Sequence, residues 1–109
     1  MRHKTLIALS IALIAAISSP LAGAQGDPDK GRIKAAGCMG CHAIPGYQNV
    51  YPSYPVPRVG GQHAQYIVAA LEAYKNGQRS HKTMQAQAAP LSREDMEDIA
   101  AYFAPAERR

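Results

Sequence analysis

The chain has 109 residues, a length that normally supports one small domain. Lys and Arg number 12 against 8 Asp and Glu, which gives a net charge of +4. Two of the basic residues, Arg2 and Lys4, stand in the first four positions, and the rest of the chain is nearly balanced. The charge therefore gives no reason to expect a nucleic-acid partner.

Residues 1–24 have the pattern of a secretory signal. Met1 to Lys4 form a basic head, Thr5 to Ile17 are almost wholly apolar, and Ala22-Gly23-Ala24 supply the small residues of a cleavage site. The apolar run is about 13 residues long, against roughly 20 for a membrane span, so a cleaved signal is favoured over an uncleaved anchor. We expect cleavage before Gln25, export to the periplasm and a single domain over residues 25–109.

The first predicted helix runs from Pro28 to about Gly37. Asp27-Pro28 provides an N-cap followed by proline at the first helical position. Ile33 and Ala36 fall on one side of this helix, and its basic residues are expected to be solvated, namely Lys30, Arg32 and Lys34.

Residues 43–61 form a different kind of segment, rich in proline and glycine. Neither a helix nor a central strand can pass through it, because its four prolines and three glycines break both. We predict a long ordered loop here. No segment of the chain shows a convincing strand.

Two further helices are predicted in the second half of the chain. One covers about 62–76, ends at Gly77 and places Tyr66, Ile67, Ala70, Leu71 and Tyr74 on one face. Residues 78–90 are read as a connection. The last helix starts at Ser92, with Asp95 completing a capping box, and stops before Pro105; its buried stripe is Met96, Ile99, Ala100 and Phe103. The fold class is therefore all-α, with three to four short helices.

The sequence is poor in large core residues. It has no Trp and one Phe, so a core built from Ala, Ile, Leu, Val and Tyr would be marginal in a domain of about 85 residues. We expect another component to fill the interior.

The chemistry is indicated by Cys38-Met39-Gly40-Cys41-His42, the single cysteine cluster in the chain. This C-x-x-C-H spacing is typical of covalent haem c attachment, with one thiol for each vinyl group and the histidine on the iron. A disulfide across two residues would close a tiny loop and stabilise little. A thioredoxin-like pair would need a βαβ pattern, and zinc would need further ligands than His63 and His81.

The second axial ligand has several candidates. Met84 is favoured, because Met1 lies in the signal, Met39 in the attachment turn and Met96 on the stripe of the last helix. A thioether raises the potential of a c-type haem. His63 or His81 would instead give a bis-histidine haem of lower potential, and a site open to gas or peroxide is the remaining alternative.

Together these residues resemble class I cytochromes c, specifically one domain of the dihaem cytochrome c4 family and its monohaem relatives. The resemblance covers residues 27–104. It rests on Gly31 seven positions before Cys38, on Val56 to His63 at the entry to the middle helix, on Thr83-Met84-Gln85, and on Leu91 to Met96 with Ala101-Tyr102-Phe103.

The resemblance implies a cytochrome c fold with crossing first and last helices around one haem. It also implies that the backbone carbonyl of Pro57 accepts a hydrogen bond from His42, a contact that orients the imidazole. Pro55 or Pro52 could hold that place, since the preceding loop is long. One tyrosine and Arg58 could bind the haem propionates, although buried rings with wet hydroxyls are the simpler reading for the tyrosines.

The function expected from these features is a periplasmic carrier of single electrons, not an enzyme. It would hold one haem c, ligated by His42 and Met84, and meet other redox proteins through small, weak interfaces. The alternative is a dedicated haem subunit of a periplasmic dehydrogenase or sulfur-oxidising complex, or a dimer. A haem enzyme or sensor with an open sixth site is a third hypothesis.

Overall fold

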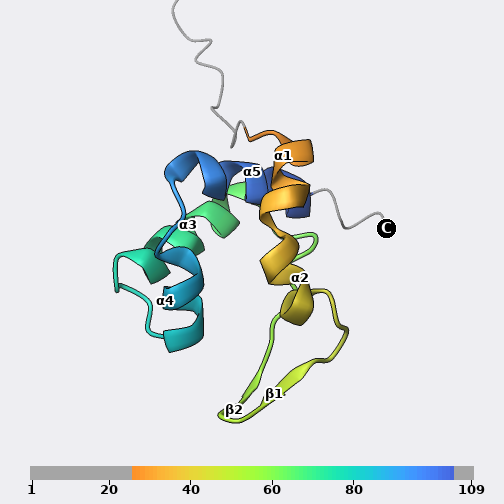
Figure 1. The fold of residues 1–109 in the computed structure, drawn as a ribbon, viewed down its shortest axis with the longest axis vertical. Helices are drawn as coiled ribbons and strands as arrows, with labels where there is room; N and C mark the ends of the chain where they lie inside the picture. Colours follow the sequence, from red (N-terminus) through yellow and green to blue (C-terminus); the bar gives the residue numbers. More distant parts are fainter. Residues whose placement is uncertain (1–25, 105–109) are drawn as a thin grey trace, which may run out of the picture.

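The computed structural model describes residues 26–104, which form five helices and one short hairpin (Figure 1). In chain order they are α1 (Pro28–Lys34), α2 (Ala36–His42), β1 (Gln48–Val50), β2 (Ser53–Pro55), α3 (Ala64–Lys75), α4 (Lys82–Ala88) and α5 (Arg93–Phe103). The predicted mainly helical class is confirmed. The predicted signal at 1–24, its cleavage site and Pro105 lie outside the described residues. Within the described part, no helix combines the length and hydropathy needed to cross a bilayer.

Helices α1 and α5 pack against each other, as the first and last helices were expected to do (Figure 1). The contact depends on Gly31, which is buried. A Cβ added there would stand 1.9 Å from the carbonyl oxygen of Asp98 and 2.9 Å from Cβ of Tyr102. Backbone therefore meets backbone at this crossing, and there is no room for a side chain.

Gly31→Ala is expected to lower the free energy of unfolding by about 2–3 kcal/mol, because the added methyl must push the two helix backbones apart. Urea unfolding followed by circular dichroism measures this. Gly37→Ala is the matched control, since its methyl would come no closer than 4.0 Å to the Gln87 side-chain oxygen. The control should change stability by about 1 kcal/mol or less. Equal losses in both variants would contradict the close approach at Gly31.

A cluster of three charged side chains lies at the crossing of α1 and α5. Nζ of Lys34 lies 2.7 Å from a carboxylate oxygen of Asp95 and 2.6 Å from Oδ2 of Asp98. The other carboxylate oxygen of Asp98 accepts a hydrogen bond from the backbone N–H of Asp27. The two carboxylates raise the pKa of Lys34, and Lys34 lowers the pKa of Asp95 to about 2 and that of Asp98 as well. All three groups are therefore charged at neutral pH.

The sidedness predicted for the first helix is wrong. Ile33 is 72% exposed and Ala36 is exposed, whereas Gly31 and Ala35 face the core. Lys34, expected to be solvated, is half-buried in the cluster of charged side chains. The reason is that α1 packs against α5 through its smallest residues. The close approach of the two helices, and not hydropathy, therefore determines which side of α1 is buried.

The helix predicted to stop near Gly37 instead continues as α2 to His42, after a single non-helical residue at Ala35. Gly37 is not among the positive-φ glycines of residues 26–104, which are Gly46, Gly61 and Gly77. Gly37 keeps helical geometry. The segment Cys38–His42 therefore lies on a helix.

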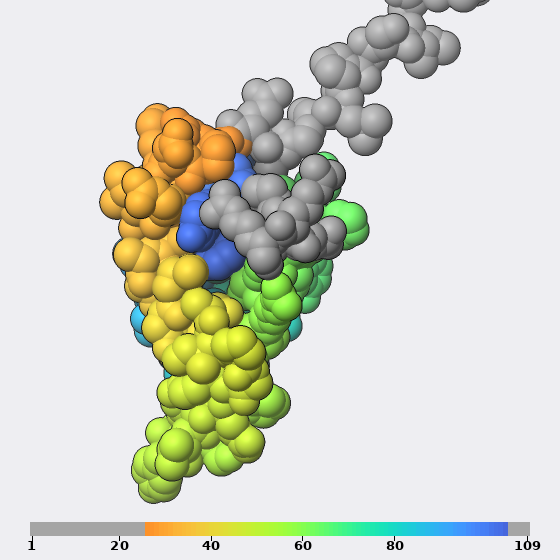
Figure 2. Space-filling model, turned by 90° about the vertical axis from the view of Figure 1, so that its right-hand side faces the viewer, coloured from red at the N-terminus to blue at the C-terminus, as the bar shows by residue number. Residues whose placement is uncertain are grey.

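The predicted loop at 43–61 contains an antiparallel hairpin, so the expectation of no strand is wrong. β1 and β2 pair in the register Gln48 with Pro55 and Val50 with Ser53. Both strands are edges of a two-stranded sheet, and an edge tolerates proline because its N–H need not pair. Figure 2 shows the hairpin as the narrow lower end of the molecule.

The predictions for the other helices are largely confirmed. α5 begins with the Ser92–Asp95 capping box, and its predicted stripe is buried. α3 is followed by Gly77 at φ +75°, but Val68 is buried in place of Tyr66, which is 52% exposed. The predicted connection 78–90 contains α4, since Lys82–Ala88 is rich in helix formers. The core comprises Ala35, Ile67, Val68, Leu71, Ala88, Met96, Ile99, Ala100 and Phe103.

Candidate functional site

Helix α2 carries both cysteines and the histidine of the attachment motif. Cys38 is half-buried and packs against the core, whereas Cys41 is exposed, and both are free thiols. Burial raises the pKa of the Cys38 thiol, with a smaller contribution from Cys41. A neutral, half-buried thiol is a poor redox nucleophile. The half-buried Cys38 is placed for a covalent link to an apolar group lying against the core, and residues 26–104 contain no βαβ unit of the kind that a thioredoxin-like pair would need.

The imidazole of His42 is oriented by the loop before α3. Its Nδ1 lies 2.7 Å from the carbonyl oxygen of Pro57. A carbonyl oxygen can only accept, so Nδ1 carries the proton and donates it. The lone pair of the ring is therefore on Nε2, which is left available for a metal. Of the three prolines weighed from the sequence, the structure selects Pro57 for this contact.

Met84 lies in the first turn of α4, within the segment 78–90 that was predicted as a connection. It is half-buried and packs against the same core cluster as Cys38 and Met39. The Gln87 side chain of α4 reaches toward α2, since a Cβ on Gly37 would be 4.0 Å from its Oε1. Half-buried sulfur side chains from two helices thus meet one apolar core. A flat apolar group with an iron atom fits this edge of the core.

The competing histidines have other surroundings. His63 is exposed at the N-cap position of α3. His81 is the N-cap of α4, where its Nδ1 accepts from the backbone N–H of Met84 at 3.4 Å. Its ring makes edge contacts with Tyr54 and Tyr74, at centroid distances of 4.6 Å and 6.4 Å. His81 therefore has a structural role, as the cap of α4 and as the ring that the two tyrosines contact. No group of three or more His, Cys, Asp or Glu in residues 26–104 could hold a metal ion.

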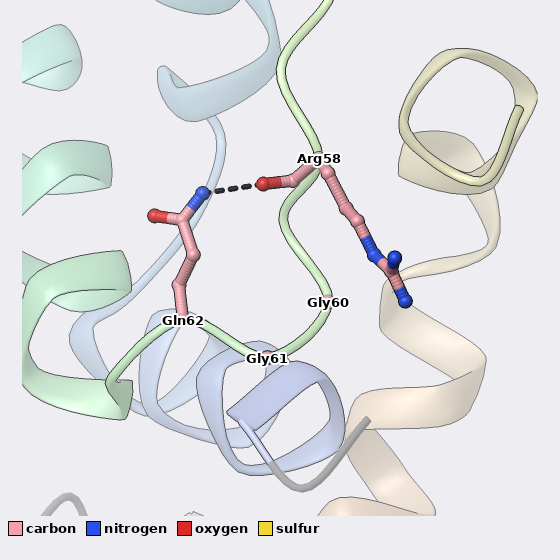
Figure 3. Close-up of a pocket in the computed structure, with 4 residues that line it drawn as sticks. All are labelled: Arg58, Gly60, Gly61 and Gln62. Carbon is pink, nitrogen blue, oxygen red and sulfur yellow. Dashed lines mark hydrogen bonds between the residues drawn. The ribbon is translucent and has the colours of Figure 1, made fainter. Parts of the chain in front are cut away.

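Arg58, Gly60, Gly61 and Gln62 line an open depression of about 320 Å³ beside this site (Figure 3). The Gln62 amide donates to the backbone carbonyl of Arg58, and the Arg58 side chain extends away from Gln62. This bond closes the turn that directly follows Pro57. The guanidinium is exposed and stays a candidate for pairing with a carboxylate of a bound cofactor.

One contact of the site was not predicted from the sequence. The hydroxyl groups of Tyr54, on β2, and Thr83, beside Met84, share a hydrogen bond of 3.1 Å. Both residues belong to segments that the sequence singled out, but nothing in the spacing links positions 29 residues apart. The contact connects the hairpin to the helix that carries Met84.

Comparison with known proteins identifies the family of the chain. The profile of the family described as cytochrome c matches residues 30–105. The chain is 38% identical over 84 residues to cytochrome c4 of Pseudomonas aeruginosa, covering 77% of this chain and 40% of that protein. It is 39% identical over 85 residues to cytochrome c-554(548) of Halomonas halodenitrificans, covering 75% of this chain and 99% of that protein.

A solved structure is also similar. Cytochrome c4 of Acidithiobacillus ferrooxidans superposes with a TM-score of 0.59 at 29% identity, over 74% of this chain and 49% of that one. The chain spans about two fifths of the length of the cytochrome c4 relatives that it matches. The family profile covers most of the chain, and the fold and the helical haem-attachment motif agree with it. The chain belongs to the cytochrome c family of electron-transfer proteins, whose cofactor is haem c.

Proposed function

We propose that this protein is an exported, periplasmic carrier of single electrons with one haem c. Cys38 and Cys41 would hold the haem covalently, and His42 and Met84 would ligate its iron. The observation that carries the proposal is the 2.7 Å contact between Nδ1 of His42 and the carbonyl oxygen of Pro57, which leaves Nε2 of the ring available to a metal. His42 lies on the same helix as both thiols. The signal at 1–24 and the domain at 25–109 belong to the same proposal.

When bound, the haem supplies an iron that takes up and releases one electron. The residues of the chain keep the reorganisation energy of this electron transfer small. The Pro57 carbonyl fixes the direction of the His42 ring and raises its basicity, while Met84 packs against the apolar core. Because both ligands stay in place, little has to reorganise when the electron moves, and no substrate has to reach the iron.

Mass spectrometry of the exported protein tests this proposal. The mature chain should begin at Gln25 and carry the added mass of one haem that survives denaturation and extraction. Cys41→Ala should keep at most one thioether link. Tyr51→Phe, at a position that is 96% exposed, is the control and should carry the same haem as the wild type. A mature chain without the added mass would refute the proposal.

A dedicated haem subunit of a dehydrogenase is the second candidate, and the hairpin favours it. Val50 and Tyr51 at its tip are 85% and 96% exposed, and Ile44 near its base is 48% exposed. Residues 43–57 contain no Lys, Arg, Asp or Glu. Exposed apolar surface without charge is typical of protein contacts. Stable co-purification of a catalytic partner, lost in Tyr51→Ser, would support this role over that of a free carrier.

A further inference from the structure

The hairpin and the first turn of α4 are joined through Tyr54. Its hydroxyl oxygen lies 3.1 Å from Oγ1 of Thr83, the residue directly before Met84. Its ring lies against the ring of His81 at a centroid distance of 4.6 Å and an interplanar angle of 84°. One side chain from β2 therefore contacts the residue beside Met84 and the residue that caps its helix.

Helix α4 needs such external support. It has seven residues, and a helix of that length is not stable by its own hydrogen bonds. Its inward contacts with the core come from Met84 and Ala88. At its start the cap is the 3.4 Å bond from the Met84 backbone N–H to His81, which is a long one. The position of the first turn is thus set largely by what lies against it.

We propose that Tyr54 is a positioning residue for Met84. By holding Thr83 and His81 it fixes the first turn of α4, and so it opposes the movement that would take the Met84 sulfur away from the iron. The inference rests on the proposed ligation by Met84. It assigns to the hairpin a part in the ligand site although none of its residues is a ligand.

Imidazole binding to the ferric haem-loaded protein tests this inference, because imidazole binds by displacing the sulfur. Tyr54→Phe keeps the ring and removes the hydroxyl, and we expect imidazole affinity to rise about threefold to tenfold, the effect of one hydrogen bond. Thr83→Val should give a rise of the same size. The double variant should rise no further, because both single changes remove the same bond. Tyr51→Phe, in the same hairpin, should match the wild type.

The melting temperature, measured in parallel, separates positioning from general stability. Wild-type imidazole affinity in both Tyr54→Phe and Thr83→Val would overturn the inference, as would additive rises in the double variant. Failure of Met84 ligation itself has a different signature: Met84→Ala would then bind imidazole no more tightly than the wild type. That result would overturn the proposed ligation and this inference together.

Discussion

Met84→Ala is expected to abolish the far-red absorption band that reports sulfur bound to ferric iron. It should also lower the midpoint potential on the order of 0.1 V, because a thioether stabilises ferrous iron and axial ligands set the potential of a haem. Alanine is a strong helix former and the buried Ala88 still packs against the core, so the variant should lose the proposed ligand and keep α4. Optical spectroscopy and redox titration of the haem-loaded protein measure both effects.

Met96→Leu is the matched control, since Met96 is 1% exposed in the core and its replacement has a similar volume. It should keep the band and lose less than about 1.5 kcal/mol of stability. The ferrous wild type should exclude carbon monoxide, whereas Met84→Ala should bind it. A wild type without the band would refute ligation by Met84, and one that binds the gas would favour the hypothesis of an open-site enzyme or sensor.

Replacing Cys38 and Cys41 together by Ala is expected to abolish cooperative folding. Within residues 26–104, the buried apolar side chains include three alanines and a single aromatic ring, that of Phe103. Such a core cannot offset the chain entropy of a domain this small unless a large apolar group completes it. The loss should be on the order of 5 kcal/mol, comparable to the whole stability of a small domain.

Thermal unfolding followed by circular dichroism of the purified double variant measures this loss. We expect weak helical signal and no sigmoidal transition. Gly37→Ala next to the motif keeps both thiols and should melt cooperatively with its haem. A double variant that contains no haem and still unfolds in one sharp transition would show that the polypeptide fills its own interior.

Local features of the molecule could be read from the chain because they depend on neighbouring residues. The Ser92–Asp95 box, the glycine after α3 and the buried stripe of α5 each involve residues a few positions apart. The haem-attachment motif is equally local, with two thiols and an imidazole within five residues. Spacing along one helix determines all of these, so periodicity and capping rules suffice.

Other predictions failed where a local signal was ambiguous. The first helix was predicted to end at about Gly37, but Gly37 has no positive φ and the chain continues as α2. The prolines and glycines of 43–61 exclude a central strand and led to the prediction of a loop, but both strands of a two-stranded hairpin are edge strands. α4 has too few inward residues to show a periodic stripe.

The amino-acid sequence by itself determined the cofactor class and the mainly helical fold, and it predicted Cys38, Cys41 and His42 as the residues that we propose hold the haem. The tertiary structure decided which contacts join distant segments: Gly31 against α5, Lys34 with Asp98 64 positions away, and Pro57 among several prolines as the acceptor for His42. The physical reason is the separation along the sequence of the residues that are in contact. A turn, a cap or a motif is stabilised by bonds between near neighbours, whereas these contacts exist only after packing has brought separate helices and loops within a few ångströms.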